Sequence, residues 1–444
     1  MSLPKYGEYV ESNVPWLGKV PSHWHVHQTK RHFRRRKDLN AGMVCDYRLA
    51  LTMNGVVPRS LEDLDGLQSS DYEGYQIFEP GDLVFKLIDL QNIKTSRVGL
   101  VPERGIMSPA YIRLEPLSTT HKRYAYWYFM ALYWTQVFNS LGGGVRQTLG
   151  PEELLTVEYP VPSRSEQAGI AAFLDRETAK IDALIAEQEK LIVLLAEKRQ
   201  ATICHAATKG LNPNSSMKDS DVAWMGEVPA HWNIAKLGLY ATVENGTTPS
   251  RAAPEYWDGG DIPWLASGEV NQLKITEASE FITEAALKNC SLRLLPAGTV
   301  VVGMIGQGKT RGMSAILRIP ATINQNLAAI CPGSRIEGMY ILYLLHAVYE
   351  WLREAGRGGN QAAMNCEILA ALRIPLPPLT EQRVIVDFIE LEAAKLDSLK
   401  AHAEQAIALL KERRTGLIAA AVTGQIDVRT AVSQRAAGPE AIAA

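Results

Sequence analysis

Cysteine is scarce in this sequence. The chain of 444 residues has only five, and no two form a Cys-x-x-Cys pair: Cys45, Cys204, Cys290, Cys331 and Cys366. This spacing argues against a zinc ribbon and against a disulfide-stapled secreted fold. It is typical of a protein from a reducing cytoplasm, and we predict a cytoplasmic location.

The sequence also lacks a strong net charge and long apolar runs. Lys plus Arg total 46 and Asp plus Glu total 48, so the formal net charge is −2. Any surface that binds nucleic acid must therefore come from local clusters. No run approaches the roughly 18 apolar residues of a membrane span. The N-terminus lacks the charged and apolar regions of a signal peptide. We expect no membrane contact.

Motifs for catalysis are missing as well. The sequence has neither a Gly-x-Ser-x-Gly elbow nor an Asp/Asn-Pro-Pro-aromatic tetrapeptide. Residues 303–310 match the phosphate-loop pattern, but the segment after them reads as a strand, whereas a phosphate loop must lead into a helix. His23, His25 and His27 alternate, yet no nearby Cys or Asp completes a metal site. We predict no catalytic, cofactor or metal site, with ATP binding at 303–310 as the alternative.

The chain repeats itself. Residues 14–24 and 222–232 share two Trp, a Gly, a Pro and a His at an offset of 222 − 14 = 208. Residues 160–167 and 375–382 share Pro-x-Pro and Glu-Gln at an offset of 375 − 160 = 215, and the segments after them match too. Both halves thus have a Trp-rich opening, a variable block, a Pro-x-Pro turn and a long helix. A period near 210 indicates a duplicated two-part unit rather than a solenoid.

The long segments are rich in helix-forming residues, and apolar residues recur in steps of four and three. The predicted seam comprises Ile170, Leu174, Ile181, Leu184, Leu191, Leu195, Ile385, Ile389, Leu396, Leu399 and Leu410. Glu177 and Glu392 occupy one seam position in both copies. Because the second block must return the chain to the start of the second helix, we predict an antiparallel coiled coil about 60 Å long. Two separate bundles are the alternative.

The blocks contain short β-type runs, turn signals and aromatic helical stretches. Pro-Gly followed by an apolar run occurs at 80–85, and Pro-x-Gly followed by an apolar run occurs at 296–302. We therefore predict an α+β fold, in which two α/β domains alternate with two long helices as a pseudo-twofold duplication. The expected boundaries are domains at 1–162 and 211–377, helices at 163–210 and 378–427, and a disordered tail at 428–444.

Local clusters point to nucleic acid. Residues 30–37 hold six cations, and glycine-rich loops with Arg and amide side chains recur at 142–147 and 356–361. Lys and Arg neutralise phosphates, whereas Arg, Asn and Gln can contact base edges bidentately. A solvated face and ordinary surface turns are the alternatives. The candidates are Lys30, Arg31, Arg34, Arg35, Arg36, Lys37, Arg146, Gln147, Gln307, Lys309, Arg311, Arg357, Asn360 and Gln361.

This order of segments, from residue 6 to about 427, resembles the specificity subunit of type I DNA restriction–modification systems. The motifs that carry the resemblance are Pro15-Trp-Leu-Gly with Pro21-x-His-Trp24, Ser108-Pro-Ala-Tyr111, Gly246-Thr-Thr-Pro-Ser250, Ile262-Pro-Trp-Leu265 and Pro375-Leu-Pro-Pro-Leu-Thr-Glu-Gln382. One departure is Ser163-Arg-Ser after Pro162, where the family more often has Pro-Leu. Thr248, Ser250 and Arg251 join the DNA-binding candidates on this ground.

The resemblance implies two target-recognition domains, each reading one half of a bipartite, gapped site in double-stranded DNA. The helix pair would set the gap and dock two methyltransferase subunits, and through them restriction subunits with translocase and nuclease activity. This chain would be non-catalytic, with S-adenosylmethionine, ATP and Mg bound by the partners. A chain from a related restriction system and a coiled-coil scaffold that reads no DNA are the alternatives.

Overall fold

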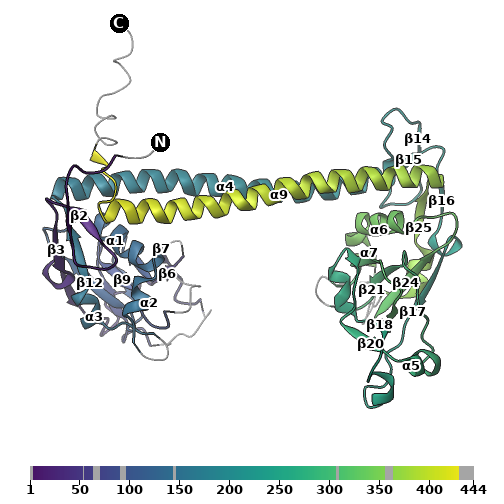
Figure 1. Cartoon of the computed structure of the whole chain (residues 1–444), viewed down its shortest axis with the longest axis horizontal. Helices are drawn as coiled ribbons and strands as arrows, with labels where there is room; N and C mark the ends of the chain where they lie inside the picture. Colours follow the sequence, from purple (N-terminus) through teal and green to yellow (C-terminus); the bar gives the residue numbers. More distant parts are fainter. Residues whose placement is uncertain are drawn as a thin grey trace, which may run out of the picture. The chain divides into compact units, whose positions relative to one another are not determined.

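The computed structural model describes residues 4–53, 55–63, 71–90, 97–143, 147–306, 310–355 and 364–429. They form two compact units: unit 1 comprises residues 1–188 and 405–444, and unit 2 comprises residues 189–404. Two long helices each contribute to both units (Figure 1). Each unit therefore contains one block, the beginning of one long helix and the end of the other.

Helix α4 (Arg164–Lys209) has 46 residues and helix α9 (Leu379–Val422) has 44, which confirms the two long helices expected from the heptads. Each helix is followed by a glycine in the left-handed region, Gly210 with φ 73° and Gly424 with φ 75°. Residues with a Cβ avoid this conformation, so glycine ends both helices favourably.

The helices run antiparallel within each unit. In unit 1, Arg414 Nε donates to Asp182 Oδ1 at 2.8 Å. In unit 2, Arg199 Nε lies 3.7 Å from Asp397 Oδ1. The second pair is the copy of the first at the sequence offset, because 397 − 182 and 414 − 199 are both 215. The two units therefore use the same helix register, and the predicted antiparallel pairing is confirmed.

The predicted seam is correct at some positions and wrong at others. Buried along the helices are Ile170, Leu174, Ile181, Leu195, Ile385, Ile389 and Leu396, and Leu410 is half-buried. Leu184, Leu191 and Leu399 are instead 51%, 39% and 51% exposed, so their assignment to the seam was wrong.

The observed seam differs from the predicted one because its steps of three and four residues alternate in the opposite order. After Leu174 the less exposed stripe passes through Thr178, Ile181, Ile185, Gln188 and Ile192. Leu-Ile pairs at 184–185 and 191–192 place an apolar residue at both possible positions, so periodicity alone could not choose between them. Glu177 and Glu392 flank the seam and bind Lys180 and Lys395 at 2.9 and 2.7 Å.

The block of unit 1 is a layered α+β fold (Figure 1). Its main sheet is antiparallel with the order β10-β9-β12-β4, a second sheet has the order β11-β8-β5, and β1-β2, β3-β13 and β6-β7 are two-stranded. The strands are β1 Tyr9–Glu11, β2 Lys19–Pro21, β3 His25–Gln28, β4 Phe33–Arg36, β5 Asp38–Leu39, β6 Leu49–Thr52, β7 Gly55–Pro58, β8 Gln76–Phe78, β9 Leu83–Phe85, β10 Val98–Leu100, β11 Gly105–Met107, β12 Ile112–Pro116 and β13 Glu158–Val161. The helices are η1 Thr29–Arg31, α1 Lys122–Trp134, α2 Val137–Leu141 and α3 Pro151–Thr156.

The block of unit 2 has a main sheet of order β17-β24-β21-β22-β19, a second sheet of order β20-β18-β23, and the pairs β14-β15 and β16-β25. The strands are β14 Met217–Asp219, β15 Glu227–Pro229, β16 Asn233–Lys236, β17 Ala241–Asn245, β18 Ile262–Leu265, β19 Lys274–Ile275, β20 Glu280–Ile282, β21 Val300–Gly303, β22 Ser314–Leu317, β23 Thr322–Ile323, β24 Leu327–Pro332 and β25 Arg373–Leu376. The helices are η2 Leu237–Leu239, η3 Pro254–Tyr256, η4 Ser267–Asn271, α5 Glu284–Asn289, α6 Gly338–Ala347, α7 Tyr349–Ala355 and α8 Cys366–Ala371.

The two main sheets correspond strand by strand. β4, β12, β9 and β10 of unit 1 match β17, β24, β21 and β22 of unit 2 in order, and all six pairings are antiparallel. The turns before β9 and β21 also agree, since Gly81 and Gly298 both have φ 91°. Two blocks with little common sequence therefore share one fold, which confirms the predicted α+β duplication.

Each core includes parts of both long helices. In unit 1, Phe85, Phe129 and Tyr159 pack with Ile170 of α4 and Ile418 of α9. In unit 2, Trp232 and Tyr340 pack with Ile203 of α4 and Ile385 of α9. Within the described ranges, no helix has the length and apolar character needed to cross a membrane.

Candidate nucleic-acid interface

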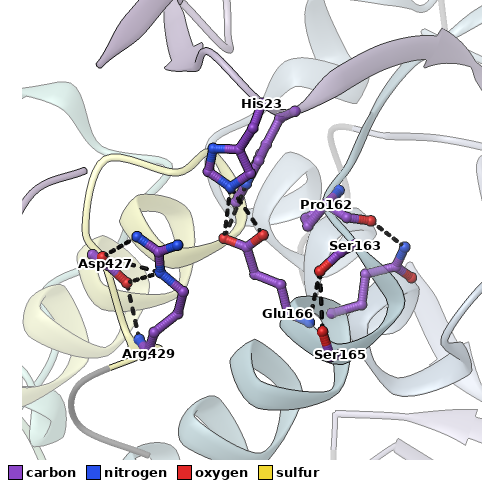
Figure 2. A network of polar contacts seen from close by, with 9 residues as sticks. His23, Pro162, Ser163, Ser165, Glu166, Asp427 and Arg429 are labelled. Atoms are coloured by element: carbon purple, nitrogen blue, oxygen red, sulfur yellow. Dashed lines mark hydrogen bonds and ion pairs between the residues drawn. The ribbon is translucent and has the colours of Figure 1, made fainter. Parts of the chain in front are cut away.

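A buried carboxylate connects the opening motif of unit 1 to helix α4. Trp24 Nε1 donates to Glu166 Oε1 at 3.1 Å, and His23 Nε2 lies 3.1 Å from Oε2 (Figure 2). The Glu166 side chain is only 5% exposed. Ser163 Oγ accepts the Glu166 N–H at 3.3 Å, so Ser163 caps the helix. We call this arrangement the joint of unit 1.

The joint of unit 2 repeats these contacts. Trp232 Nε1 donates to Glu381 Oε1 at 3.0 Å, and His231 Nε2 lies 2.9 Å from Oε2. Here the carboxylate is more open, because the Glu381 side chain is 30% exposed. The tryptophans, histidines and glutamates of the repeated motifs thus meet in space in both halves.

The neighbouring glutamine is equivalent in both joints. Gln167 Nε2 donates to the Pro162 carbonyl at 2.9 Å, and its Oε1 accepts the His121 N–H at 2.9 Å. Gln382 makes the same pair of bonds, to the Pro377 carbonyl and from the Glu337 N–H, each at 2.9 Å. Each glutamine therefore ties the Pro-x-Pro turn to the segment that precedes α1 or α6.

The end of the other long helix completes each joint. In unit 1, Tyr124 Oη lies 3.4 Å from the Val422 carbonyl of α9, and in unit 2, Tyr340 Oη donates to the Ala207 carbonyl of α4 at 3.0 Å. Unit 1 adds an ion pair of 2.7 Å between Arg429 and Asp427 (Figure 2). The backbone N–H of Asp427 donates to the Pro4 carbonyl. Both long helices are thus held at both of their ends.

Loops lie together at the end of each main sheet that is away from the joint. In unit 1, Phe85 at the end of β9 is paired with Ile112 at the start of β12, and Arg36 at the end of β4 is paired with Arg113. In unit 2, Gly303 of β21 is paired with Leu327 of β24, and Asn245 of β17 is paired with Ala328 of β24. The loops after β4 and β9, and after β17 and β21, therefore meet the turn before β12 or β24. We call these loops and turns the loop edge of each unit.

Part of the sequence matches a known protein family. Residues 229–407 match the family described as the type I restriction modification DNA specificity domain. The second half of the chain therefore contains a domain of this family.

The relatives that resemble this chain in sequence are distant. The type I restriction enzyme EcoR124I/EcoR124II specificity subunit of Escherichia coli is 26% identical over 266 residues, which cover 58% of this chain and 59% of that protein. The MjaVIII specificity subunit of Methanocaldococcus jannaschii is 24% identical over 336 residues, which cover 74% of this chain and 76% of that protein. The chain thus matches less than two thirds of the Escherichia coli relative.

Two solved structures share the fold of this chain. A structure from work on complex assembly and conformational transition of the type I R-M system has a TM-score of 0.65, 17% identity, and coverage of 91% of this chain and 98% of that one. The crystal structure of the HsdS subunit from Thermoanaerobacter tengcongensis has a TM-score of 0.53 and 16% identity, with the same coverage.

The basic run at residues 30–37 lies in η1 and β4 and ends directly after β4. Lys30, Arg31, Arg34, Arg35 and Lys37 are exposed and Arg36 is half-buried. Arg35 binds Glu152 at 3.3 Å and Arg36 binds Glu115 at 2.8 Å, so part of the charge is neutralised within the chain. Only Lys37, directly after β4, reaches the loop edge.

The remaining candidate of unit 1 also lies near the loop edge. Gln147, with φ 43°, accepts the Leu90 N–H at its carbonyl at 3.3 Å, which brings it beside the loop after β9. Arg146 lies outside the described residues.

In unit 2 the candidates Thr248, Ser250 and Arg251 follow β17 at the loop edge. Arg251 lies 3.8 Å from the Trp257 ring centroid and 5.1 Å from that of Trp264, and it binds Glu280 at 2.5 Å. The structure therefore gives Arg251 a role inside the domain, where it braces its own loop.

The segment 303–310 leads into a strand. β22 pairs antiparallel with β21, as expected for a glycine-rich β-turn and unlike a phosphate loop. Arg311 Nη2 donates to the Arg353 carbonyl at 2.8 Å. The other candidates of these loops lie outside the described residues: Gln307, Lys309, Arg357, Asn360 and Gln361.

The histidines of the opening segment stack rather than surround an ion. His27 Nδ1 lies 3.1 Å from His32 Nε2, and the rings of His25 and His27 are 5.9 Å apart. Burial lowers the pKa of His27 and the pKa of His32, which favours their neutral forms. Among the described residues, no group of three His, Cys, Asp or Glu side chains could hold a metal ion.

Sequence reasoning missed one feature of the loop edge, the turn at 324–326 in unit 2. Asn324 is buried and Gln325 is exposed. An Asn-Gln-Asn sequence between two apolar runs is a turn signal. It could have been found from the sequence, but not its contact with the loop after β17.

Proposed function

We propose that this chain recognises a bipartite, gapped site in double-stranded DNA and does no chemistry itself. The observation that carries the proposal is the duplicated loop edge. Two sheets with one strand order present equivalent loops whose sequences differ. A shared scaffold with different loops is what two readers of two different half-sites require.

The helix pair is the element that would set the gap between the half-sites. Both joints fix a long helix at its start and the other long helix at its end. The helices of 46 and 44 residues are continuous from one joint to the other. Half-sites on one face of DNA are about 34–36 Å apart, and helices of this size are long enough for that spacing.

The helices also carry a duplicated apolar surface. Leu184 and Leu409 of unit 1 are 51% and 58% exposed, and their copies at the 215-residue offset, Leu399 and Leu194 of unit 2, are 51% and 50% exposed. Exposed apolar patches mark sites of association. Because each unit carries one such leucine from each helix, the surface fits two copies of one partner, the methyltransferase subunits.

This assignment of partners can be tested by stoichiometry. Leu184→Asp with Leu409→Asp should remove one methyltransferase subunit from the complex, and Leu194→Asp with Leu399→Asp should remove the other, both measured by native mass spectrometry. Gln405→Asp, which adds one negative charge at an exposed polar position of α9, should leave both methyltransferase subunits in place. Two bound subunits in all variants would contradict the docking assignment.

The partners would supply the chemistry. We assign S-adenosylmethionine to the methyltransferase subunits, and ATP and Mg to restriction subunits that join through them. The complex would work in the cytoplasm, where its DNA lies. A chain from a related restriction system is the second candidate, and the subunits that co-purify with the chain separate the two.

Selection of random duplex DNA by the chain, purified with its methyltransferase subunits, tests the central proposal. We expect two unlike short motifs separated by a fixed gap, with binding that weakens as salt increases. A single ungapped motif would limit reading to one unit. Absence of enrichment at low salt would favour the scaffold alternative.

A further inference from the structure

The turn before β24 in unit 2 is fixed on three sides. Asn324 N–H donates to the Leu265 carbonyl at 3.0 Å, and Asn324 Oδ1 accepts the Asn326 N–H at 3.0 Å. The Met304 N–H, from the loop after β21, donates to the Asn326 carbonyl at 2.9 Å. Gln325 stands at the apex of this turn and is exposed. Its backbone is therefore rigid, while its side chain faces outward.

The amide of Gln325 is oriented by a neighbouring loop. Thr248 Oγ1 donates its hydrogen to Gln325 Oε1. Within the part of the chain that the structure describes, the oxygen keeps one lone pair free and Nε2 keeps both of its N–H groups. An exposed glutamine normally samples several rotamers, so this contact selects one orientation before any ligand arrives.

The loop that carries Thr248 is itself braced. A Cβ on Gly246 would lie 1.7 Å from the Ile323 carbonyl oxygen, so only glycine permits this approach. The Thr247 N–H donates to the same carbonyl at 3.1 Å, and the Thr247 carbonyl accepts Trp264 Nε1 at 3.1 Å. Arg251, stacked on Trp257, holds the far side of the loop.

We propose that Gln325 reads an adenine in the half-site of unit 2, with Thr248 as the residue that positions its amide. This rests on the proposed function. In the major groove adenine presents N6 as a donor and N7 as an acceptor. The free lone pair of Gln325 Oε1 accepts from N6, while Nε2 donates to N7. Guanine presents two acceptors and cannot satisfy the oxygen, so the fixed amide favours adenine.

The equivalent turn of unit 1 offers an internal contrast. Its exposed residues are Pro109 and Ala110, and the buried Gln76 holds it by donating from Nε2 to the carbonyls of Ser108, Pro109 and Tyr111 at 3.3, 3.1 and 2.8 Å. This turn has no outward amide. Changes at Gln325 should therefore alter one half of the DNA motif and leave the other half as a reference.

The test is DNA selection with the full-length chain and its methyltransferase subunits. Gln325→Ala should lose the preference for adenine at one position of one half-site, by about 5- to 150-fold. Gln325→Glu keeps the shape and only accepts hydrogen bonds, so it should shift that position towards cytosine. Thr248→Val should weaken the preference, and Thr248→Ser should restore it.

Two controls separate the possible outcomes. Asn233→Ala removes an exposed amide from β16, away from the loop edge, and should leave the motif unchanged. Replacing the assigned adenine with 7-deazaadenine removes N7 and should weaken wild-type binding but not binding by Gln325→Ala. An identical motif for wild type and both Gln325 variants, or a change at a base other than adenine, would overturn the inference. If wild type selects no two-part motif, the proposed function itself fails.

Discussion

The two joints make the same contacts at different depths, which predicts unequal costs for the same substitution. Glu166→Ala should destabilise unit 1 more than Glu381→Ala destabilises unit 2. Each change removes the acceptor of a buried indole N–H, that of Trp24 or Trp232. The Glu166 side chain is 5% exposed and the Glu381 side chain is 30% exposed, so water can replace only the second carboxylate.

The magnitudes follow from this difference. Losing a hydrogen bond to a charged group and leaving a buried donor unsatisfied should cost unit 1 about 2–3 kcal/mol. With water as a substitute acceptor, the cost in unit 2 should be about 1 kcal/mol. For domains of this size, one kcal/mol lowers Tm by about 2–4 °C. We therefore expect Tm to fall by about 4–12 °C for unit 1 in Glu166→Ala and by about 2–4 °C for unit 2 in Glu381→Ala.

Differential scanning calorimetry of the full-length chain measures the Tm of both units. Glu166→Gln retains a hydrogen-bond acceptor, so it should lower the Tm of unit 1 less than Glu166→Ala. Glu187→Ala, at an exposed position of α4, is the control and should stay within about 0.5 kcal/mol of wild type. Equal decreases for the two alanine variants, or a larger one for Glu381→Ala, would refute the argument from burial.

Three further predictions concern the helices, the loop edge and the histidines. Inserting one heptad at matched positions of α4 and α9 should lengthen the DNA gap by about three base pairs and leave both half-sites unchanged, because seven residues add about 10 Å; an unchanged gap in the selected motif would contradict the helices as its determinant. Gly246→Ala should abolish selection of one half-site, since its Cβ would meet the Ile323 carbonyl, whereas Gly268→Ala has open space and should be silent in the same selection. Because the pKa values of His27 and His32 lie below 6.5 in the folded chain, unfolding takes up protons, and the Tm of unit 1 should fall as pH decreases from about 6.5 through the folded values. The His27→Gln, His32→Gln double variant should show a flatter pH profile in calorimetry, and an equal slope would count against this cause.

The sequence was sufficient for the features that depend on its own periodicity. The long helices, the antiparallel pairing and the shared fold of the blocks all follow from the repeats and the heptads. The seam failed at Leu184 and Leu191 because an isoleucine follows each of them, and the choice depends on the facing helix. Local pattern alone does not identify the partner of a side chain.

The candidate site shows the same limit. Arg36 was chosen as part of a basic run and Arg251 from the family resemblance, but their partners, Glu115 and Glu280, are distant in sequence. Gln325 was missed because its significance depends on a contact with Thr248, 77 residues away. The composition of a loop predicts what it could bind, whereas the fold decides which of its side chains remain available.

In each block, the joint and the loop edge lie at opposite ends of the same strands. β12 begins at the loop edge and leads towards the His121–Gln167 bond of the joint, and β24 leads in the same way towards Glu337 and Gln382. Under the proposed function, a new target preference would arise by exchanging the segment between the two sides of a joint, without redesigning the helices. The Trp-rich opening and the Pro-x-Pro turn, where the chain crosses the joint, would be the crossover points for such an exchange.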